Sequence, residues 1–539
     1  MEEVGYVYRS SLSEVEITAF TPVEAASYLY VEFDRPTQGR VLLFVSSVSC
    51  EDEICRALRA RDLKATVERE RAQPELVEEP DFSVKAVPVL DLHTKGRPRT
   101  PIPPKSPVYK PSKEILEEAF SVSYSSIGDL YARSPEASWI RLGVLRSKRD
   151  VEVRVNVDAV LSKHLAILGS TGSGKSNTVA VLIDRVVSIG GQVLVVDSHG
   201  EYVNLELVQG EVLPVQAKIN PLQIAPSMLA DILIAEPAPE QRRLLRRAIR
   251  EVNKLYNDFL RGGMQAARSE GMIKAFIEQA EGEIQVEGCD YLKTLYGYLL
   301  REMMMQNNKR EQERYEKVLS KLEDDMVEFG DIISLEASDP TALLHPGRAV
   351  ILDVSEMPQK GRDEVVSHVA YQLLRRAARR EILPTLLIVE EAHLYLATNL
   401  NTRAKRSLEK IAREGRKYGV GLVIVSQRPR GIDPNVLSQV NSICVLRIRQ
   451  PEDQRHIKES SEWFTEDMYS ALPTLETGES VLLGEWVKMP VAVKIDRHEG
   501  KKRGVTFSAT AAWLKALEEK QKPIDVESQI MEEAERLFS

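Results

Sequence analysis

The sequence predicts an α/β fold in which a mainly parallel sheet is covered by helices. Near-continuous apolar runs such as Gln192–Val196 are typical of parallel strands that are buried on both faces. A glycine-rich loop directly follows the apolar run His164–Leu168, and Asn177–Asp184 has the composition of a helix. Strand and helix patterns then alternate along the chain, as in βαβ units. With 539 residues the chain is long enough for several domains.

Residues 1–140 are predicted to form a small antiparallel β-barrel. Short apolar runs alternate there with turns, for example Gly5–Tyr8, Val15–Thr18 and Tyr28–Phe33. We expect a helix over Glu51–Ala65 and an extended conformation for the proline-rich segment Arg97–Pro107.

The α/β core is predicted in two parts, because helical periodicity interrupts the strand pattern. Gln241–Arg250 and Tyr291–Arg301 repeat apolar residues with a period near 3.6, which predicts an inserted helical bundle. After Glu391 we expect two further strands of the sheet and then an amphipathic tail. The predicted boundaries are 141–225 and 336–497 for the core, 226–335 for the bundle and 498–539 for a C-terminal brace.

Composition restricts the class of protein. The formal net charge of −9 argues against a uniformly basic coat for nucleic acid, although it allows a basic groove or channel. No basic and apolar leader and no apolar stretch of about 18 residues is evident, so we expect a cytoplasmic protein without a membrane segment. Cys50 and Cys55 could pair if oxidised, but two ordinary thiols are the favoured interpretation.

The loop Gly169–Ser176 reads Gly-Ser-Thr-Gly-Ser-Gly-Lys-Ser, a complete phosphate-binding pattern. Its backbone N–H groups would surround the phosphates of a nucleoside triphosphate, and the dipole of the following helix would add to the attraction. Lys175 would reach the β- and γ-phosphates, and the Ser176 hydroxyl would hold Mg²⁺. The alternative is a glycine-rich turn without a ligand. The predicted nucleotide contacts are Gly169, Ser170, Thr171, Gly172, Ser173, Gly174, Lys175, Ser176 and Asn177.

Three predicted strands end in acids, namely Asp197, Asp353 and the pair Glu390–Glu391. Hydrolysis needs a carboxylate near Mg²⁺ and a group that orients the attacking water. Only the third strand supplies two adjacent carboxylates, so we predict Glu390 near Mg²⁺ and Glu391 as the catalytic base. Acids at strand ends also occur without a catalytic role.

Two further polar groups are candidates. Gln427 follows the next strand, at the sheet edge where ligands of open α/β folds bind, and could contact the γ-phosphate. Arg413 and Arg416 precede that strand, and arginine can stabilise a transferring phosphoryl group, often from a neighbouring subunit. Simple strand capping and a solvated helix end are the respective alternatives.

Two ATPase classes fit poorly. Glu390–His393 reads Glu-Glu-Ala-His, which suggests a DEAH-box helicase, but too few strands follow it for a second ATPase lobe. The signature Leu-Ser-Gly-Gly-Gln of ABC ATPases does not occur.

The motifs together resemble the HerA family of DNA-translocating ATPases in the broader HerA/FtsK group. The matching segments are Ile167–Asn177, Asp197–Tyr202, Ile219–Leu222, Glu390–His393 and Arg413–Pro429. The resemblance implies a RecA-like core that binds ATP and Mg²⁺, with Asp197 and Glu391 serving the ATP site. It implies that Arg416, or alternatively Arg413, enters the site of the next subunit.

The resemblance also implies partners. These are double-stranded DNA inside a homo-hexameric ring, a NurA-type nuclease, and Mre11 and Rad50 in the resection of double-strand breaks, with a nucleoid-associated location. The barrel would mediate ring assembly and the nuclease contact, and the tail would brace a neighbouring subunit. A conjugation-type pumping ATPase and a nucleotide-gated scaffold are the alternative functions.

Basic loops after core strands are the candidate DNA contacts. They comprise Lys360 and Arg362 in one loop and Arg403, Lys405 and Arg406 in another. Either loop could instead be an ordinary solvated surface.

Overall fold

The computed structural model describes residues 1–34, 38–50, 82–121, 138–234, 238–284, 289–330, 332–460 and 472–500. The helix predicted over Glu51–Ala65, Cys55 and all but the first residues of the predicted C-terminal brace lie outside these ranges.

The predicted N-terminal barrel is confirmed. Six strands close in the order β1-β2-β5-β4-β3-β6. Side chains alternate between the two faces, so that Val4, Leu29 and Val84 are buried in a core of their own. The proline-rich segment Arg97–Pro107 leads from β5 to β6 almost without regular secondary structure. The strands are β1 (Glu3–Ser10), β2 (Val15–Ala19), β3 (Tyr28–Phe33), β4 (Gly39–Cys50), β5 (Phe82–Asp91) and β6 (Pro107–Tyr109).

The second sheet has eleven strands in the order β11-β12-β10-β13-β14-β9-β15-β16-β17-β7-β8. Pairing is parallel from β11 to β15 and antiparallel from β15 to β8. The strands are β7 (Trp139–Leu145), β8 (Glu152–Asn156), β9 (Leu165–Leu168), β10 (Gln192–Asp197), β11 (Glu211–Gln216), β12 (Arg348–Asp353), β13 (Thr385–Val389), β14 (Val420–Ser426), β15 (Ser442–Leu446), β16 (Glu479–Gly484) and β17 (Val491–Ile495).

The expectation of only two strands after Glu391 was wrong, because the described part of the chain has four there. The additional strands β16 and β17 form an antiparallel extension between β15 and β7. Through this extension, β7 and β8, which precede the glycine-rich loop in the sequence, belong to the same sheet as β15.

Helices pack against this sheet or connect its strands. They are α3 (Lys113–Phe120), α4 (Val157–Lys163), α5 (Lys175–Ser188), α11 (Gln359–Ala378), α12 (His393–Leu396), α13 (Arg403–Glu414), α14 (Pro434–Leu437) and α15 (Pro451–Ser460), with the 3-10 turns η3 (Pro340–Ala342), η4 (Gly415–Tyr418), η5 (Pro429–Gly431) and η6 (Leu472–Thr474). Strands β9, β10, β13 and β14 are buried along their full length, as expected for a parallel sheet between helical layers.

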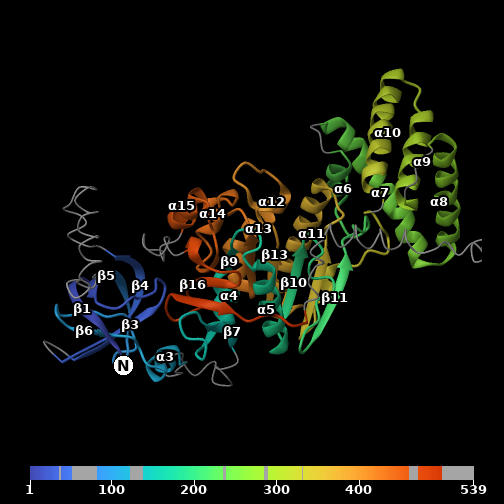
Figure 1. Ribbon diagram of the computed structural model, residues 1–539. Helices are drawn as coiled ribbons and strands as arrows, with labels where there is room; N and C mark the ends of the chain where they lie inside the picture. Colours follow the sequence, from blue (N-terminus) through green and yellow to red (C-terminus); the bar gives the residue numbers. More distant parts are fainter. Residues whose placement is uncertain are drawn as a thin grey trace, which may run out of the picture.

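Five helices lie between β11 and β12 in the chain and form a separate bundle. They are α6 (Pro226–Leu233), α7 (Pro239–Arg261), α8 (Met264–Glu283), α9 (Asp290–Met304) and α10 (Lys309–Phe329). Because β11 and β12 are neighbouring strands, the chain leaves the sheet after β11, forms the bundle and returns to the same side of the sheet with β12. The bundle and the barrel lie at opposite ends of the core (Figure 1). Within the described ranges, every helix is too short or too polar to cross a membrane.

Candidate functional site

The glycine-rich loop lies at the carboxyl end of β9, between β14 and β15. Gly172 and Gly174 have φ angles of 72° and 108°, a region that side chains disfavour. A Cβ on Gly169 would come within 2.8 Å of the Leu446 Cβ, so the loop needs glycine there for close packing. Helix α5 begins at Lys175, with Ser176 in its first turn, and its N-terminus points its free N–H groups toward the loop.

Neighbouring segments hold the loop. Ser170 donates from its backbone N and its Oγ to the carbonyl oxygen of Arg447, at 3.0 and 2.8 Å. The N–H of Gly478 donates to the Ser173 carbonyl oxygen at 2.8 Å. The Ser173 Oγ is buried against Gly169 and has no hydrogen-bond partner among the described residues.

Lys175 lies against the same loop. Its Nζ donates to the carbonyl oxygens of Gly169 and Ser170, at 2.9 and 3.2 Å. Burial lowers its pKa, although the charges of Glu391 and Glu390 oppose this shift. Phosphate oxygens at this position would replace the carbonyls as acceptors and would favour the charged ammonium.

Glu390 follows β13 directly and is 5% exposed. It accepts a hydrogen bond from the Tyr202 hydroxyl. Burial raises the pKa of Glu390 to about 8, and the surrounding charges of Glu201, Asp197 and Glu391 act in the same direction. The carboxyl is therefore mostly neutral at pH 7. A neutral carboxyl is a poor ligand for Mg²⁺, which prefers carboxylates, so metal binding by Glu390 would first have to remove its proton.

Glu391 has the opposite state. Burial would raise its pKa, but His393, Lys175 and His199 outweigh burial, and the net shift is downward. Its Oε2 lies 3.1 Å from the His393 Nδ1, and its Oε1 lies 3.6 Å from the His199 Nε2. The φ angle of Glu391 is 45°, which is uncommon for a residue with a side chain and is often found at functional positions. An ionised carboxylate at this edge can accept a proton from water.

Asp197 organises the adjacent loop. It is fully buried, and it accepts N–H bonds from His199, Glu201 and Tyr202 at 2.8 to 3.2 Å. These bonds hold the backbone of Tyr202 where its hydroxyl donates to the Glu390 carboxyl. Asp197 therefore lies at the end of β10, beside β13, and its oxygens accept hydrogen bonds from the backbone. Tyr202, His199 and His393 received no predicted role, although the first two lie within the quoted Asp197–Tyr202 segment and His393 ends the quoted Glu390–His393 segment.

Gln427 and Asn177 lie on either side of the loop. The Gln427 Oε1 accepts a hydrogen bond from the Thr171 Oγ1 at 2.6 Å, so the structure brings this amide to the loop. The side chain of Asn177, a predicted nucleotide contact, has partners within the chain. Its Nδ2 donates to the Asp496 carbonyl oxygen at 2.8 Å, and its Oδ1 accepts from the His498 N–H at 3.0 Å. Asn177 therefore ties α5 to the segment after β17.

Arg413 and Arg416 lie far from the glycine-rich loop of their own chain. Both are exposed, in the last turn of α13 and in η4, immediately before β14 begins. Strand β14 runs parallel to β9, with Ser426 beside Leu168 at their carboxyl ends. The seven residues of β14 span about 20 Å. The arginines before its first residue and the loop near its last residue therefore lie at opposite ends of the strands. Neither arginine forms an ion pair with any residue in the described part of the chain.

Most of the predicted DNA contacts have partners inside the chain. Lys405 is 8% exposed and its Nζ lies 2.8 Å from the Asp433 Oδ2, so the predicted DNA contact of Lys405 needs correction. Arg362 donates to the carbonyl oxygens of Met357 and Ser355, at 2.7 and 2.6 Å. Arg403 forms an ion pair with Asp231. The Lys360 Nζ lies 4.7 Å from the centre of the Phe329 ring. Arg406 is exposed.

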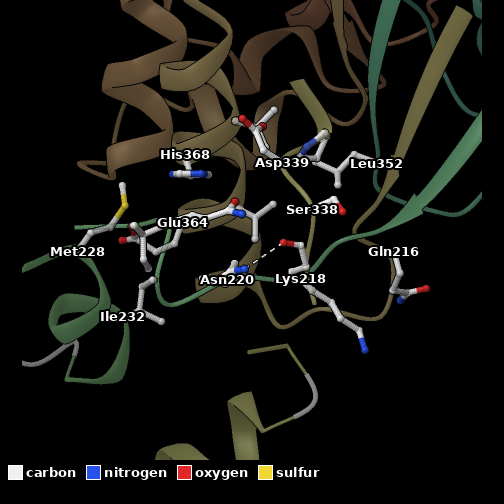
Figure 2. A pocket seen from close by; sticks show the side chains of 17 residues that line it. Gln216, Lys218, Asn220, Met228, Ile232, Ser338, Asp339, Leu352, Glu364 and His368 are labelled. Atoms are coloured by element: carbon white, nitrogen blue, oxygen red, sulfur yellow. Dashed lines mark hydrogen bonds between the residues drawn. The ribbon is translucent and has the colours of Figure 1, made fainter. Parts of the chain in front are cut away.

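A separate cavity lies at the carboxyl ends of β11 and β12, lined also by α6 and α11 (Figure 2). Its lining includes none of the predicted nucleotide contacts. Asn220, from the quoted Ile219–Leu222 segment, donates to the carbonyl oxygens of Leu335 and Ala337 at 2.7 and 3.3 Å. The Asn220 amide therefore closes one wall between the strand ends and the segment that returns from the bundle.

The chain is similar to known DNA repair helicases. The family model described as "Helicase HerA, central domain" matches residues 140–373. The chain is 31% identical over 528 residues to the DNA double-strand break repair helicase HerA of Sulfolobus acidocaldarius, covering 96% of this chain and 97% of the relative. It is 35% identical to the protein of that name from Saccharolobus solfataricus, covering 76% of this chain and 77% of the relative.

One solved structure with a related arrangement is VirB4 of Thermoanaerobacter pseudethanolicus. Its TM-score is 0.45 at 17% identity, and the match covers 68% of this chain and 98% of that one. The sequence match to the Sulfolobus acidocaldarius helicase extends over nearly the full length of both chains. The protein is therefore an ATPase that belongs to the HerA family of helicases.

Proposed function

We propose that this protein is an ATP-driven translocase on double-stranded DNA that acts as a hexameric ring. The position of Arg416 carries the proposal. Arg416 is exposed at the end of β14 opposite the phosphate loop of its own chain, so any ATP site that it serves belongs to another subunit. Subunits joined head to tail form a closed ring when the rotations from one subunit to the next add up to a full turn.

The residues present fit ATP and Mg²⁺. Gly172 and Gly174 allow the loop to curve so that its N–H groups would surround the phosphates, and Lys175 and Ser176 would hold the phosphates and the metal ion. Mg²⁺ would neutralise charge on the phosphates. Glu391 is placed to accept the proton of the attacking water. Gln427, hydrogen-bonded to Thr171 of the loop, can transmit a change at the phosphates to β14.

The partners follow from the relatives. Proteins similar to this chain are named DNA double-strand break repair helicases, which supports DNA as the substrate and a nucleoid-associated location. We extend the proposal to a NurA-type nuclease bound at the barrel, and to Mre11 and Rad50 in the same repair step. The predicted brace, 498–539, would contact a neighbouring subunit.

Two other functions compete with this one. A nucleotide-gated scaffold would not need an ionised carboxylate such as Glu391 in a strained backbone conformation, so the site favours hydrolysis. A conjugation-type pump would share the ATPase geometry and would differ in the substrate that it moves.

The test is ATP hydrolysis with and without duplex DNA. Lys175→Ala should abolish binding of the phosphates, and Glu391→Gln should lower kcat by about 10²- to 10⁴-fold. Arg416→Ala should lower it by about 10³-fold or more, as for arginine fingers that act between subunits. Lys417→Ala, at an exposed neighbouring position, is the matched control and should retain activity. A wild-type rate that duplex DNA does not change would contradict the proposal.

A further inference from the structure

Helix α7 carries a row of exposed cations on one face. The helix contains seven Lys or Arg residues against three Asp or Glu residues. Its buried face, which includes Leu245, Ile249 and Val252, packs within the bundle. The opposite face repeats a cation every three or four residues from Arg243 to Lys254, and Asp258 occupies the position between Lys254 and Arg261. This row, the α7 stripe, consists of Arg243, Arg247, Arg250, Lys254 and Arg261, all of them exposed.

The α7 stripe differs from the other arginines of the helix, because those have partners. Arg242 lies 3.5 Å from Asp231 and donates to the Ile234 carbonyl oxygen, and Arg246 donates to the Arg242 carbonyl oxygen. Across the described ranges, no side chain of the α7 stripe forms an ion pair or a hydrogen bond. In a chain with a formal net charge of −9, such a row is a local exception that an anionic partner would explain.

Nearby acids balance only part of the row. Glu251, Glu302 and Arg247 all lie near Tyr298, so the two acids offset the charge of Arg247. Arg243, Arg250 and Lys254 lie on the same side of the helix without an ion pair to any described residue.

The dimensions and chemistry of the row favour nucleic acid over protein. It extends about 17 Å from Arg243 to Lys254 and about 27 Å to Arg261, the scale of a stretch of phosphate backbone. Protein interfaces usually centre on exposed aromatic or apolar residues. On α7 the large exposed apolar residues are Phe259 and Leu260, at the C-terminal end and outside most of the row.

We propose that the α7 stripe binds the phosphate backbone of duplex DNA, as a contact on the helical bundle that is separate from the ATPase core. The inference rests on the proposed function, because it takes DNA as the substrate. Contacts to phosphate position a duplex without reading its sequence, so the stripe would bind any sequence equally well. The bundle projects from the core at the end away from the barrel (Figure 1), so the stripe would guide the duplex on that side.

The test uses the full-length protein and a fluorescent duplex, with binding measured by anisotropy over a range of salt concentrations. The variant is the triple change Arg243→Gln, Arg250→Gln and Lys254→Gln. Each lost phosphate contact should reduce the slope of log K against log salt by about 0.9, so we expect the slope to fall by about 3. DNA-independent ATP hydrolysis and the Tm should not change, because these side chains are exposed and lie outside the nucleotide site.

A matched control removes the same charge from the barrel, through Arg9→Gln, Arg99→Gln and Lys105→Gln at exposed positions. The control should keep the wild-type slope. An unchanged slope in the α7 variant, or an equal fall in both variants, overturns the inference while leaving the proposed function intact. A wild-type protein that does not bind duplex DNA at all contradicts the proposed function itself.

Discussion

Replacing Glu390 by glutamine should change how stability depends on pH. In the folded protein, burial raises the pKa of this carboxyl to about 8 from an ordinary value of 4.5. The unfolded chain therefore releases the proton near pH 4.5, whereas the folded chain retains it until near pH 8. Between these values the unfolded state binds fewer protons, so stability falls as the pH rises. Glutamine has no proton to lose and can still accept from Tyr202.

The size of the effect follows from the shift. One pKa unit corresponds to about 1.4 kcal/mol, so wild type should lose up to about 5 kcal/mol relative to Glu390→Gln between pH 4.5 and pH 8. The assay is urea unfolding of both proteins without nucleotide at several pH values in this window. The difference between the two free energies of unfolding should grow steadily and level off above pH 8. Parallel curves for the two proteins would refute the assignment of a neutral Glu390.

Two further substitutions test the packing by thermal or urea unfolding. Lys405→Met should cost about 3 to 5 kcal/mol because it leaves Asp433 buried without its charge partner, and adding Asp433→Asn should recover most of the loss; a loss that is not recovered would contradict the ion-pair account. Gly297→Ala should cost about 1 to 3 kcal/mol, because its Cβ would lie 2.0 Å from the Phe276 carbonyl oxygen, whereas Gly271→Ala, which faces open space, should be neutral or stabilising. Equal stabilities of these two glycine variants would show that α8 and α9 do not pack this closely.

Much of the architecture could be predicted because its signals are local. The phosphate loop has a fixed spacing of glycines and lysine, and buried parallel strands have continuous apolar runs. The short barrel strands alternate with turns. By contrast, β16 and β17 were not expected, because short apolar runs near the end of a core resemble other buried segments.

The roles of individual polar side chains depended on tertiary contacts that sequence does not show. Asn177 follows the phosphate loop in sequence, yet its amide meets the segment after β17, which is more than 300 residues away. Lys405 belongs to a basic run but turns inward to Asp433. The different protonation of Glu390 and Glu391 depends on burial and on the histidines that surround only Glu391.

Complementation between two inactive variants tests whether each ATP site is completed by Arg416 of another subunit, as we propose. Lys175→Ala has a defective phosphate loop but an intact Arg416, and Arg416→Ala has the reverse. In an equal mixture that assembles at random, about one quarter of the sites would combine an intact loop with a donated arginine, as expected for a head-to-tail interface. If Arg416 is donated between subunits, the mixture should regain about that fraction of wild-type ATP hydrolysis. A mixture as inactive as its components, although wild-type and variant subunits co-assemble, would contradict it.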